Sequence, residues 1–268
     1  MQELYSSTEN KEGMNDTAIH ALLNKLIEEM KGAKNILLVP PDFTRCYSYA
    51  GPITEYLYLE LSKFASVSVI PALGTHAAMT VTERTEMFGT HIPNSAFIIH
   101  DWQNDVVKIG EIPSSVVSEI SNGTYAEKIE VEVNHHLVDQ TYDQIISIGQ
   151  VVPHEIVGLA NYTKNLLVGL GGRDMINKSH FVGALCNMEK ALGVIDTPAR
   201  LLFDYAQKNF LVKLPITFVF TVTTFLEETL TVHGVFIGKS RKAFEEAAQL
   251  SQKYNIVHVE KRAKKVIT

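Results

Sequence analysis

Apolar residues recur along the chain with the three- and four-residue spacing that places them on one face of a helix. Residues 18–30 show this pattern, with Ile19, Leu22, Leu23, Leu26 and Ile27 as the apolar positions. The same spacing predicts helices over residues 53–64, 177–192, 198–210 and 240–254, and a short helix over 82–88 with Thr82 as its cap.

Short apolar runs between these segments predict strands. They cover residues 35–39, 66–72, 96–100 and 144–149, an alternating strand at 128–134, a hairpin of 216–223 with 230–237, and a closing strand at 256–259. Buried strands that alternate with helices indicate an α/β fold with a mainly parallel, twisted, Rossmann-like sheet. We therefore expect helices on both faces of this sheet and a late antiparallel hairpin. Residues 1–16 are expected to form a flexible tail, and residues 17–268 a single α/β domain.

Composition narrows the class of protein. Apolar residues make up 46% and charged residues 20%, and the formal net charge is -6. The only basic cluster is the short KRAKK segment at 261–265, which predicts a solvated chain end and no nucleic-acid partner. Two cysteines and no CxxC motif favour a reducing cytoplasm. The N-terminus lacks the apolar core of a signal peptide, and the apolar run at 214–226 is too short to span a bilayer, so no membrane association is expected.

Polar and titratable residues follow four of the predicted strands. Asp42 and Arg45 come after the first, His76 after the second, His100 in the third and His154 after the strand at 144–149. Each alone is more often a capped turn or a structural histidine. Ligands of open parallel sheets bind beyond the carboxyl ends of the strands, so four such positions together predict one shared pocket.

The residue types suit a small hydroxy or keto acid. Histidine titrates near neutral pH, so His76 and His154 suit proton transfer at the two faces of one carbon. The guanidinium of Arg45 matches a carboxylate, and Asp42 is placed to orient a histidine or a cofactor hydroxyl.

A glycine-rich stretch lies further along, between Lys164 and His180. Gly169, Gly171 and Gly172 are able to bring backbone amides close to a phosphate, although glycines are also ordinary turn formers. Without further information, Lys164 is a surface lysine and His180 a residue on a helix face.

Taken together, these residues resemble the nickel-dependent lactate racemase family, in particular its N-terminal, cofactor-carrying domain. The resemblance extends from about residue 35 to the end of the chain. The motifs that carry it are Asp42-Phe-Thr-Arg45, Gly74-Thr-His76, Val133-Asn134, Gln150-Val-Val-Pro-His154, Lys164 and His180. The intervals from His154 to Lys164 and from Lys164 to His180 agree with the family residue for residue.

The resemblance implies a nickel-pincer nucleotide, pyridinium-3,5-bisthiocarboxylic acid mononucleotide, attached at Lys164 as a thioamide. It also implies that His180 ligates nickel, and imidazole is a ligand that suits this metal. Asp42, Thr44 and Gly169 are the further cofactor-binding residues that we expect.

The implied activity is racemisation or epimerisation of a small, lactate-like 2-hydroxy acid by a hydride relay. One of His76 and His154 removes the hydroxyl proton, the hydride passes to the cofactor, and it returns to either face of a planar keto acid. Arg45 holds the carboxylate and Asp42 supports the catalytic histidines. The expected partners are this substrate, cofactor-biosynthesis proteins and either a separate C-terminal domain chain or a second copy of the chain.

The sequence also departs from the family pattern. Ala160-Asn-Tyr-Thr precedes Lys164 where the family has Ser-Gly-Gly-Arg, and bulky Tyr162 is expected to change how the cofactor approaches. Val168-Gly169 replaces a usual Pro-Gly, and Cys46 follows Arg45 in place of proline. These differences indicate a divergent subgroup. The family's C-terminal domain is expected to be absent, which leaves a fragment, a separate subunit or a free-standing domain as explanations.

Two alternatives to a racemase remain at this stage. One is a non-catalytic or partner-dependent domain that binds the cofactor or a small acid. The other is a metal hydrolase or a nicotinamide dehydrogenase, which would need a three-ligand zinc site or a full dinucleotide fingerprint, and neither occurs with convincing spacing. The remaining histidines are expected to be structural or at the surface: His20, His91, His135, His136, His233 and His258.

Overall fold

The computed structural model describes residues 3–185 and 188–257. Its main sheet has six strands in the order β1-β10-β9-β6-β2-β3. Four of them are parallel: β2 (Asn35–Val39), β3 (Ser66–Val69), β6 (Gln144–Gln150) and β9 (Ile216–Leu226). Two antiparallel strands complete one edge: β10 (Thr229–Gly238) and β1 (Leu4–Ser7). The predicted fold class, with its late antiparallel hairpin, is confirmed.

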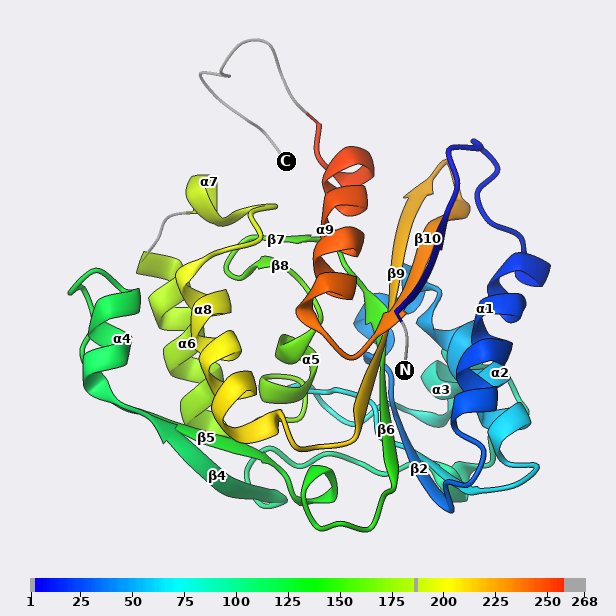
Figure 1. The fold of residues 1–268 in the computed structure, drawn as a ribbon, viewed down its shortest axis with the longest axis horizontal. Coiled ribbons are helices and arrows are strands. Elements are labelled where there is room, and N and C mark those ends of the chain that lie inside the picture. The colour runs from blue at the N-terminus through cyan, green and yellow to red at the C-terminus, as the bar shows by residue number, and fades with distance from the viewer. Residues whose placement is uncertain (1–2, 186–187, 258–268) are drawn as a thin grey trace.

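Helices cover both faces of this sheet (Figure 1). On one side lie α1 (Asp16–Glu29), α2 (Ala50–Leu61) and α3 (Val81–Phe88). The other side carries the remaining helices: α4 (Ser114–Ile120), α5 (Thr163–Leu167), α6 (Arg173–Leu185), α7 (Met188–Ala191), α8 (Pro198–Ala206) and α9 (Arg241–Asn255). Short 3-10 helices cover Phe43–Ser48, Asn94–Ala96 and His135–Leu137, and a π-helical turn covers Gln207–Leu211.

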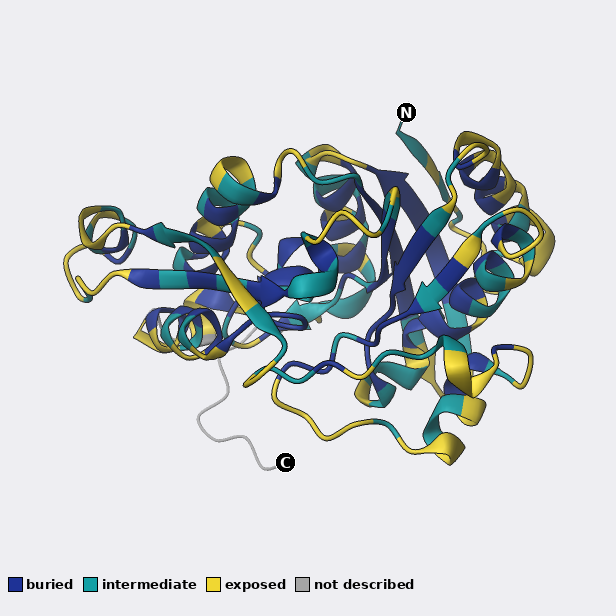
Figure 2. Ribbon diagram, turned by 90° about the horizontal axis from the view of Figure 1, so that it is seen from below, coloured by how far each residue is buried: buried dark blue, intermediate teal, exposed yellow. Residues whose placement is uncertain are grey.

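The alternation of side chains along each strand divides the interior into two cores. In β2, Ile36 and Leu38 pack into the core beneath α1 and α2, whereas Leu37 and Val39 pack into the opposite core. Both faces of β2 are covered by helices, so residues that point to either face are apolar and the strand is an unbroken apolar run. Figure 2 shows buried strands through the centre and exposed residues on the outer sides of the helices.

A second, antiparallel pair of strands lies beside the main sheet (Figure 1). It joins β4 (Val106–Ile112) to β5 (Ile129–Asn134) and packs against α6 and α8. The alternating strand at 128–134 was predicted, but β4 was not. Two short strands of two residues each, β7 (Pro153–His154) and β8 (Gly158–Leu159), form an antiparallel pair between β6 and α5 in the sequence.

Several local predictions are wrong. The expected flexible tail contains β1, in which Leu4 pairs with Ile237 of β10, so its backbone hydrogen bonds fix it to the sheet edge. Residues 96–100 form no strand, because only Phe97 makes a bridge, to Val69. The cap of α3 is Thr80, whose side chain forms a capping box with Glu83.

The ends of the C-terminal elements also differ from the prediction. The helix expected at 177–192 begins earlier, at Arg173, and the described residues are helical to Leu185 and again in α7. The helix expected at 198–210 gives way to the π-helical turn after Ala206. The α9 helix agrees with the prediction. The closing strand at 256–259 and the KRAKK segment lie partly or wholly outside the described residues.

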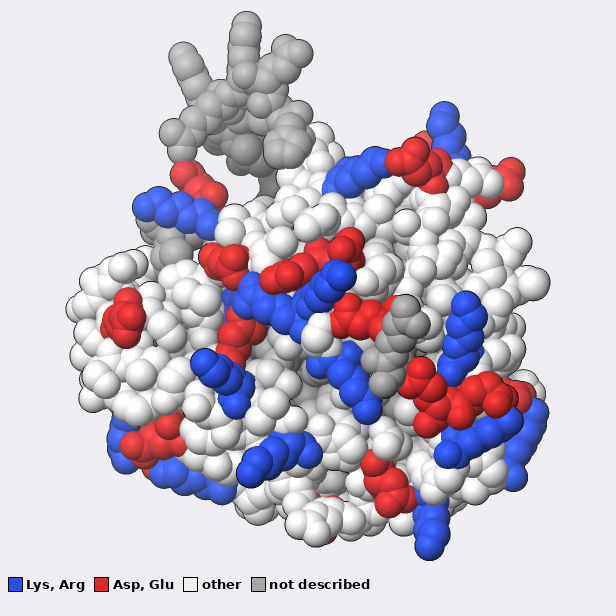
Figure 3. Space-filling view, in the orientation of Figure 1, with Lys and Arg blue, Asp and Glu red and all other residues white. Residues whose placement is uncertain are grey.

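On the face drawn in Figure 3, basic and acidic side chains are interspersed, and neither sign forms a continuous area. None of the helices in the described part of the chain is long and apolar enough to cross a membrane.

Candidate functional site

A cavity of about 410 Å³ opens beyond the carboxyl ends of β2, β3 and β6. Its walls contain all but one of the residues that the sequence places at the shared pocket: Asp42, Thr44, Arg45, His76, His154, Lys164, Gly169 and His180. The rule that parallel strands bring their carboxyl ends together therefore holds here. His100 does not line this cavity. It is buried, and its Nδ1 lies 3.1 Å from the side-chain amide of Asn134.

Asp42 and His76 form a hydrogen-bonded pair on one wall. Asp42 is buried directly after β2, and its Oδ2 lies 2.5 Å from Nδ1 of His76, whose side chain is 58% exposed. The hydroxyl of Thr44 donates to the other carboxylate oxygen at 2.5 Å. When the Nδ1–H of His76 donates to Asp42, Nε2 keeps its lone pair and is able to accept a proton.

His154 carries its proton on the opposite nitrogen. Its Nδ1 accepts the backbone N–H of Ile156 at 3.2 Å, so the neutral ring holds its proton on Nε2. Burial, reinforced by the charge of Lys164, lowers the pKa of His154 to about 4. The ring is therefore neutral near pH 7. One wall of the cavity thus offers an imidazole nitrogen that is able to take up a proton, and another offers an N–H that donates a hydrogen bond, an arrangement that suits a substrate hydroxyl group.

Lys164 is the second residue of the short helix α5 and lines the cavity. Burial lowers its pKa to about 8, and the neighbouring cations Arg45 and Arg200 act in the same direction. A lysine with this pKa exists in part as the neutral amine near pH 7, which is the nucleophilic form.

The backbone before Lys164 adopts conformations that favour glycine. Asn161 has φ of 70° and Tyr162 has φ of 58°. These are the two positions at which the resembling family has glycine, the residue that adopts such conformations most readily. Such conformations cost free energy and persist only where the surroundings hold them.

Tyr162 does not line the cavity, contrary to the expectation that it changes the cofactor's approach. Its side chain is 4% exposed and stacks on Phe244 with ring centroids 5.2 Å apart. It also packs against Phe218, so the departure from glycine fills the core behind the cavity.

Arg200 of α8 holds this turn from behind, and sequence reasoning missed it. Its side chain is fully buried, and its guanidinium donates to the carbonyls of Leu159 at 2.6 Å and Asn161 at 3.2 Å. It also lies 3.4 Å from the hydroxyl of Thr163, which stands where the family has arginine. The buried guanidinium of α8 thus lies beside the position at which the family motif has arginine.

His180 lies on α6 and points a free nitrogen away from its helix. Its Nδ1–H donates to the carbonyl of Ile176 at 2.8 Å, which leaves the Nε2 lone pair available. Metal-binding histidines are usually oriented by such a bond on the other ring nitrogen. Its ring centroid is 6.4 Å from that of His154, and burial lowers its pKa, so it is neutral and able to ligate a metal.

The glycine-rich stretch forms part of the cavity wall, but its backbone amides are not free to bind a phosphate as the sequence suggested. The N–H groups of Gly169, Gly171 and Gly172 all donate to backbone carbonyls. Gly169 remains in the cavity wall, where its carbonyl accepts the N–H of Gly74 at 2.8 Å. A Cβ at Gly169 would lie 2.6 Å from that of Ala72, so the close approach of these two walls requires glycine.

Asn165 is a further residue that the sequence did not reveal. It lines the cavity, and its amide donates to the carbonyl of Val39 at 3.1 Å and to the hydroxyl of Ser147 at 3.0 Å. These bonds attach α5, and with it Lys164, to the end of β2 and the middle of β6. An asparagine one residue after a lysine carries no pattern that would have identified this role.

Comparison with known proteins places this geometry in a family. The family described as the lactate racemase N-terminal domain matches residues 2–193. A crystal structure of a Thermotoga maritima protein is similar with a TM-score of 0.84 and 25% identity, covering 92% of this chain and 61% of that one. The lactate racemase apoprotein from Thermoanaerobacterium thermosaccharolyticum has a TM-score of 0.65 and 24% identity, covering 91% and 53%. The chain therefore spans 61% and 53% of these two proteins. No curated protein matches it in sequence.

Proposed function

Because the chain belongs to the lactate racemase N-terminal domain family, we propose that it is the cofactor-holding part of a racemase or epimerase of a small 2-hydroxy acid such as lactate. The observation that carries the proposal is the convergence of Lys164, His180 and two differently protonated histidines on one cavity.

The residues of the cavity fit a nickel-pincer nucleotide. Lys164 supplies an amine with a lowered pKa for a covalent link, and His180 supplies an oriented imidazole for nickel. The volume of about 410 Å³ falls within the range of small-ligand sites, roughly 300–1,000 Å³. The nucleotide would lie against Thr44, the Asp42 carboxylate and the close-packed wall at Gly169. When bound, the cofactor would accept a hydride from the substrate carbon and return it.

The two histidines would handle the hydroxyl proton. His76, oriented by Asp42, would accept the hydroxyl proton at Nε2 and return it from there, and the neutral His154 would donate a hydrogen bond from its Nε2–H to the substrate oxygen. For the opposite enantiomer His154 would be the base, which requires its ring proton to move from Nε2 to Nδ1 first. The protein's own contribution is then proton transfer and orientation.

Arg45 would bind the substrate carboxylate. It lies in the 3-10 helix after β2 and lines the cavity with Lys164 and His154. Its fixed positive charge also disfavours protonation of both neighbours. One guanidinium would thus position the acid and help keep the amine and the imidazole neutral.

The alternative is a domain that binds the cofactor or a small acid but turns it over only with a partner. The chain spans 61% and 53% of the two similar proteins, so the activity of those whole proteins is a proposal for this chain. The partner would be a C-terminal domain on a separate chain or a second copy of this one. In either case we expect a cytoplasmic protein that receives its cofactor from dedicated biosynthetic proteins.

The test is a chiral assay of lactate on the chain produced together with the cofactor-making proteins. Racemase function predicts interconversion of the two enantiomers, a loss of at least about a hundredfold in the variants His76→Gln and His154→Gln, and little change in His91→Gln, an exposed surface control. Cofactor-loaded protein that binds lactate without interconverting it would favour the alternative. Protein that neither loads nor binds would refute both.

A further inference from the structure

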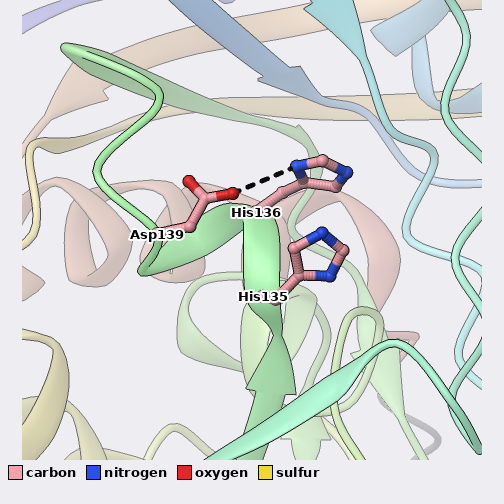
Figure 4. A group of neighbouring side chains, drawn as sticks. All are labelled: His135, His136 and Asp139. Carbon is pink, nitrogen blue, oxygen red and sulfur yellow. Dashed lines mark ion pairs between the residues drawn. The ribbon is translucent and has the colours of Figure 1, made fainter.

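A second cluster of potential metal ligands lies outside the cavity, on the turn that follows β5. His135 and His136 belong to the 3-10 helix His135–Leu137, and Asp139 comes shortly after it. One ring nitrogen of each histidine and one carboxylate oxygen all lie within 4.8 Å of one another. Figure 4 shows the carboxylate facing the ring of His136, with the ring of His135 alongside. None of the three residues lines the cavity described above.

The distance between His136 and Asp139 fits a shared metal ion better than a hydrogen bond. Nδ1 of His136 lies 3.5 Å from Oδ2 of Asp139. Nitrogen and oxygen ligands about 2.0–2.1 Å from a tetrahedral ion are separated by about 3.4 Å. This nitrogen is shielded from solvent and has no hydrogen-bond partner in the described part of the chain. A buried polar atom without a partner is uncommon in native proteins and calls for an explanation.

Neighbouring backbone groups already orient the side chains of His135 and Asp139, and a further hydrogen bond fixes the backbone of His136. Nδ1 of His135 lies 3.3 Å from the carbonyl of Asp105, and donation there leaves its Nε2 free. The N–H of Thr141 donates to Oδ1 of Asp139 at 2.9 Å, so Oδ2 is the free oxygen. The backbone N–H of His136 is fixed by the side chain of Asn134 at 3.0 Å. In metal sites, hydrogen bonds from groups that do not touch the metal orient the ligand side chains in this way.

We infer that His135, His136 and Asp139 form a binding site for a divalent transition-metal ion of the class that zinc represents, with ligand atoms Nε2, Nδ1 and Oδ2 respectively. Two imidazoles and one carboxylate suit zinc and similar ions, and water would complete the coordination. This reverses the expectation that both histidines are merely structural or at the surface. It does not depend on the function proposed for the cavity.

The position of the site indicates a structural consequence. Asn134, the last residue of β5, donates its backbone N–H to the carbonyl of Leu170 at 2.8 Å. Leu170 lies between the helix that carries Lys164 and the helix that carries His180. An ion bound at the turn would hold the end of β5 in place. Through the hydrogen bond to Leu170, it would also restrain the loop that joins these two helices.

The probe is zinc chloride, added to the full chain carrying His180→Ala so that the cavity loses its own metal ligand. Long-range proton–nitrogen NMR spectra of the histidine rings report which nitrogen binds. We expect one equivalent of zinc to shift Nε2 of His135 and Nδ1 of His136 before other rings respond. We also expect it to raise the melting temperature.

Variants make the test specific. In the same background, His135→Gln combined with Asp139→Asn should weaken zinc binding by at least about tenfold. His91→Gln, which alters an exposed histidine paired with Glu55, should leave binding unchanged. Circular dichroism checks that each variant remains folded. Absence of a zinc-dependent shift at His135 and His136, equal shifts at the exposed histidines, or undiminished binding by the folded double variant would overturn the inference.

Discussion

Lys164 offers the sharpest quantitative prediction, because the proposed covalent link requires a neutral amine. With a pKa of about 8, about a quarter of the Lys164 side chains are unprotonated at pH 7.5. For an ordinary lysine, with a pKa of 10.5, the neutral share is about one in a thousand. Burial beside two cations therefore increases the reactive form roughly 240-fold.

The assay is pulse labelling with a small amine-reactive reagent at a series of pH values, with the extent at each lysine measured by peptide mass spectrometry. Comparing Lys164 with itself across pH removes the effect of its restricted access, and exposed Lys31 serves as an internal reference. The labelling of Lys164 should reach half its maximum near pH 8. In Arg45→Gln the midpoint should move upward, because a neighbouring positive charge is lost. A midpoint near pH 10.5 in the wild-type protein would refute the reasoning.

Three further substitutions test other parts of the account. Arg200→Met leaves two buried carbonyls without donors at about 1–3 kcal/mol each, so urea unfolding should show a free energy of unfolding lower by about 2–6 kcal/mol. A change below about 1 kcal/mol would contradict the role given to this guanidinium. Thr80→Ala removes the capping box and should cost about 1 kcal/mol in the same measurement, whereas Thr82→Ala should cost less. Asp42→Asn should reduce the rate of racemisation by the loaded protein at least about a hundredfold, because His76 loses the carboxylate that sets its tautomer. An unchanged rate would exclude that role.

Much of the fold and the grouping of the site followed from the sequence. The run at 35–39 is apolar at consecutive positions because β2 is covered on both faces. Asp42, His76 and His154 follow three parallel segments, so one topological rule was enough to bring them together.

The failures have physical causes. Residues 96–100 are as apolar as a strand, but they make only one bridge to Val69 because the chain enters them from a 3-10 helix. The N-terminal segment looks polar because β1 is an edge strand with alternating exposure. Its pairing with β10 depends on residues more than 200 positions away, which no local pattern reveals.

Long-range contacts also explain what was missed in the site. Arg200 and Asn165 act through hydrogen bonds to backbone atoms of other elements, and neither belongs to a recognisable motif. Tyr162 was expected to change how the cofactor approaches, because the family has the smaller glycine at this position. The positive φ of Tyr162 instead turns its side chain into the aromatic core.

The most direct test of the central claim is the intact mass and nickel content of the chain produced together with the cofactor-making proteins. The account predicts added mass located at Lys164 and about one nickel per chain. It also predicts that His180→Ala loses the nickel while Lys164→Arg loses the added mass. Unmodified, nickel-free wild-type protein under conditions that load a known lactate racemase would contradict the claim that this cavity holds the cofactor.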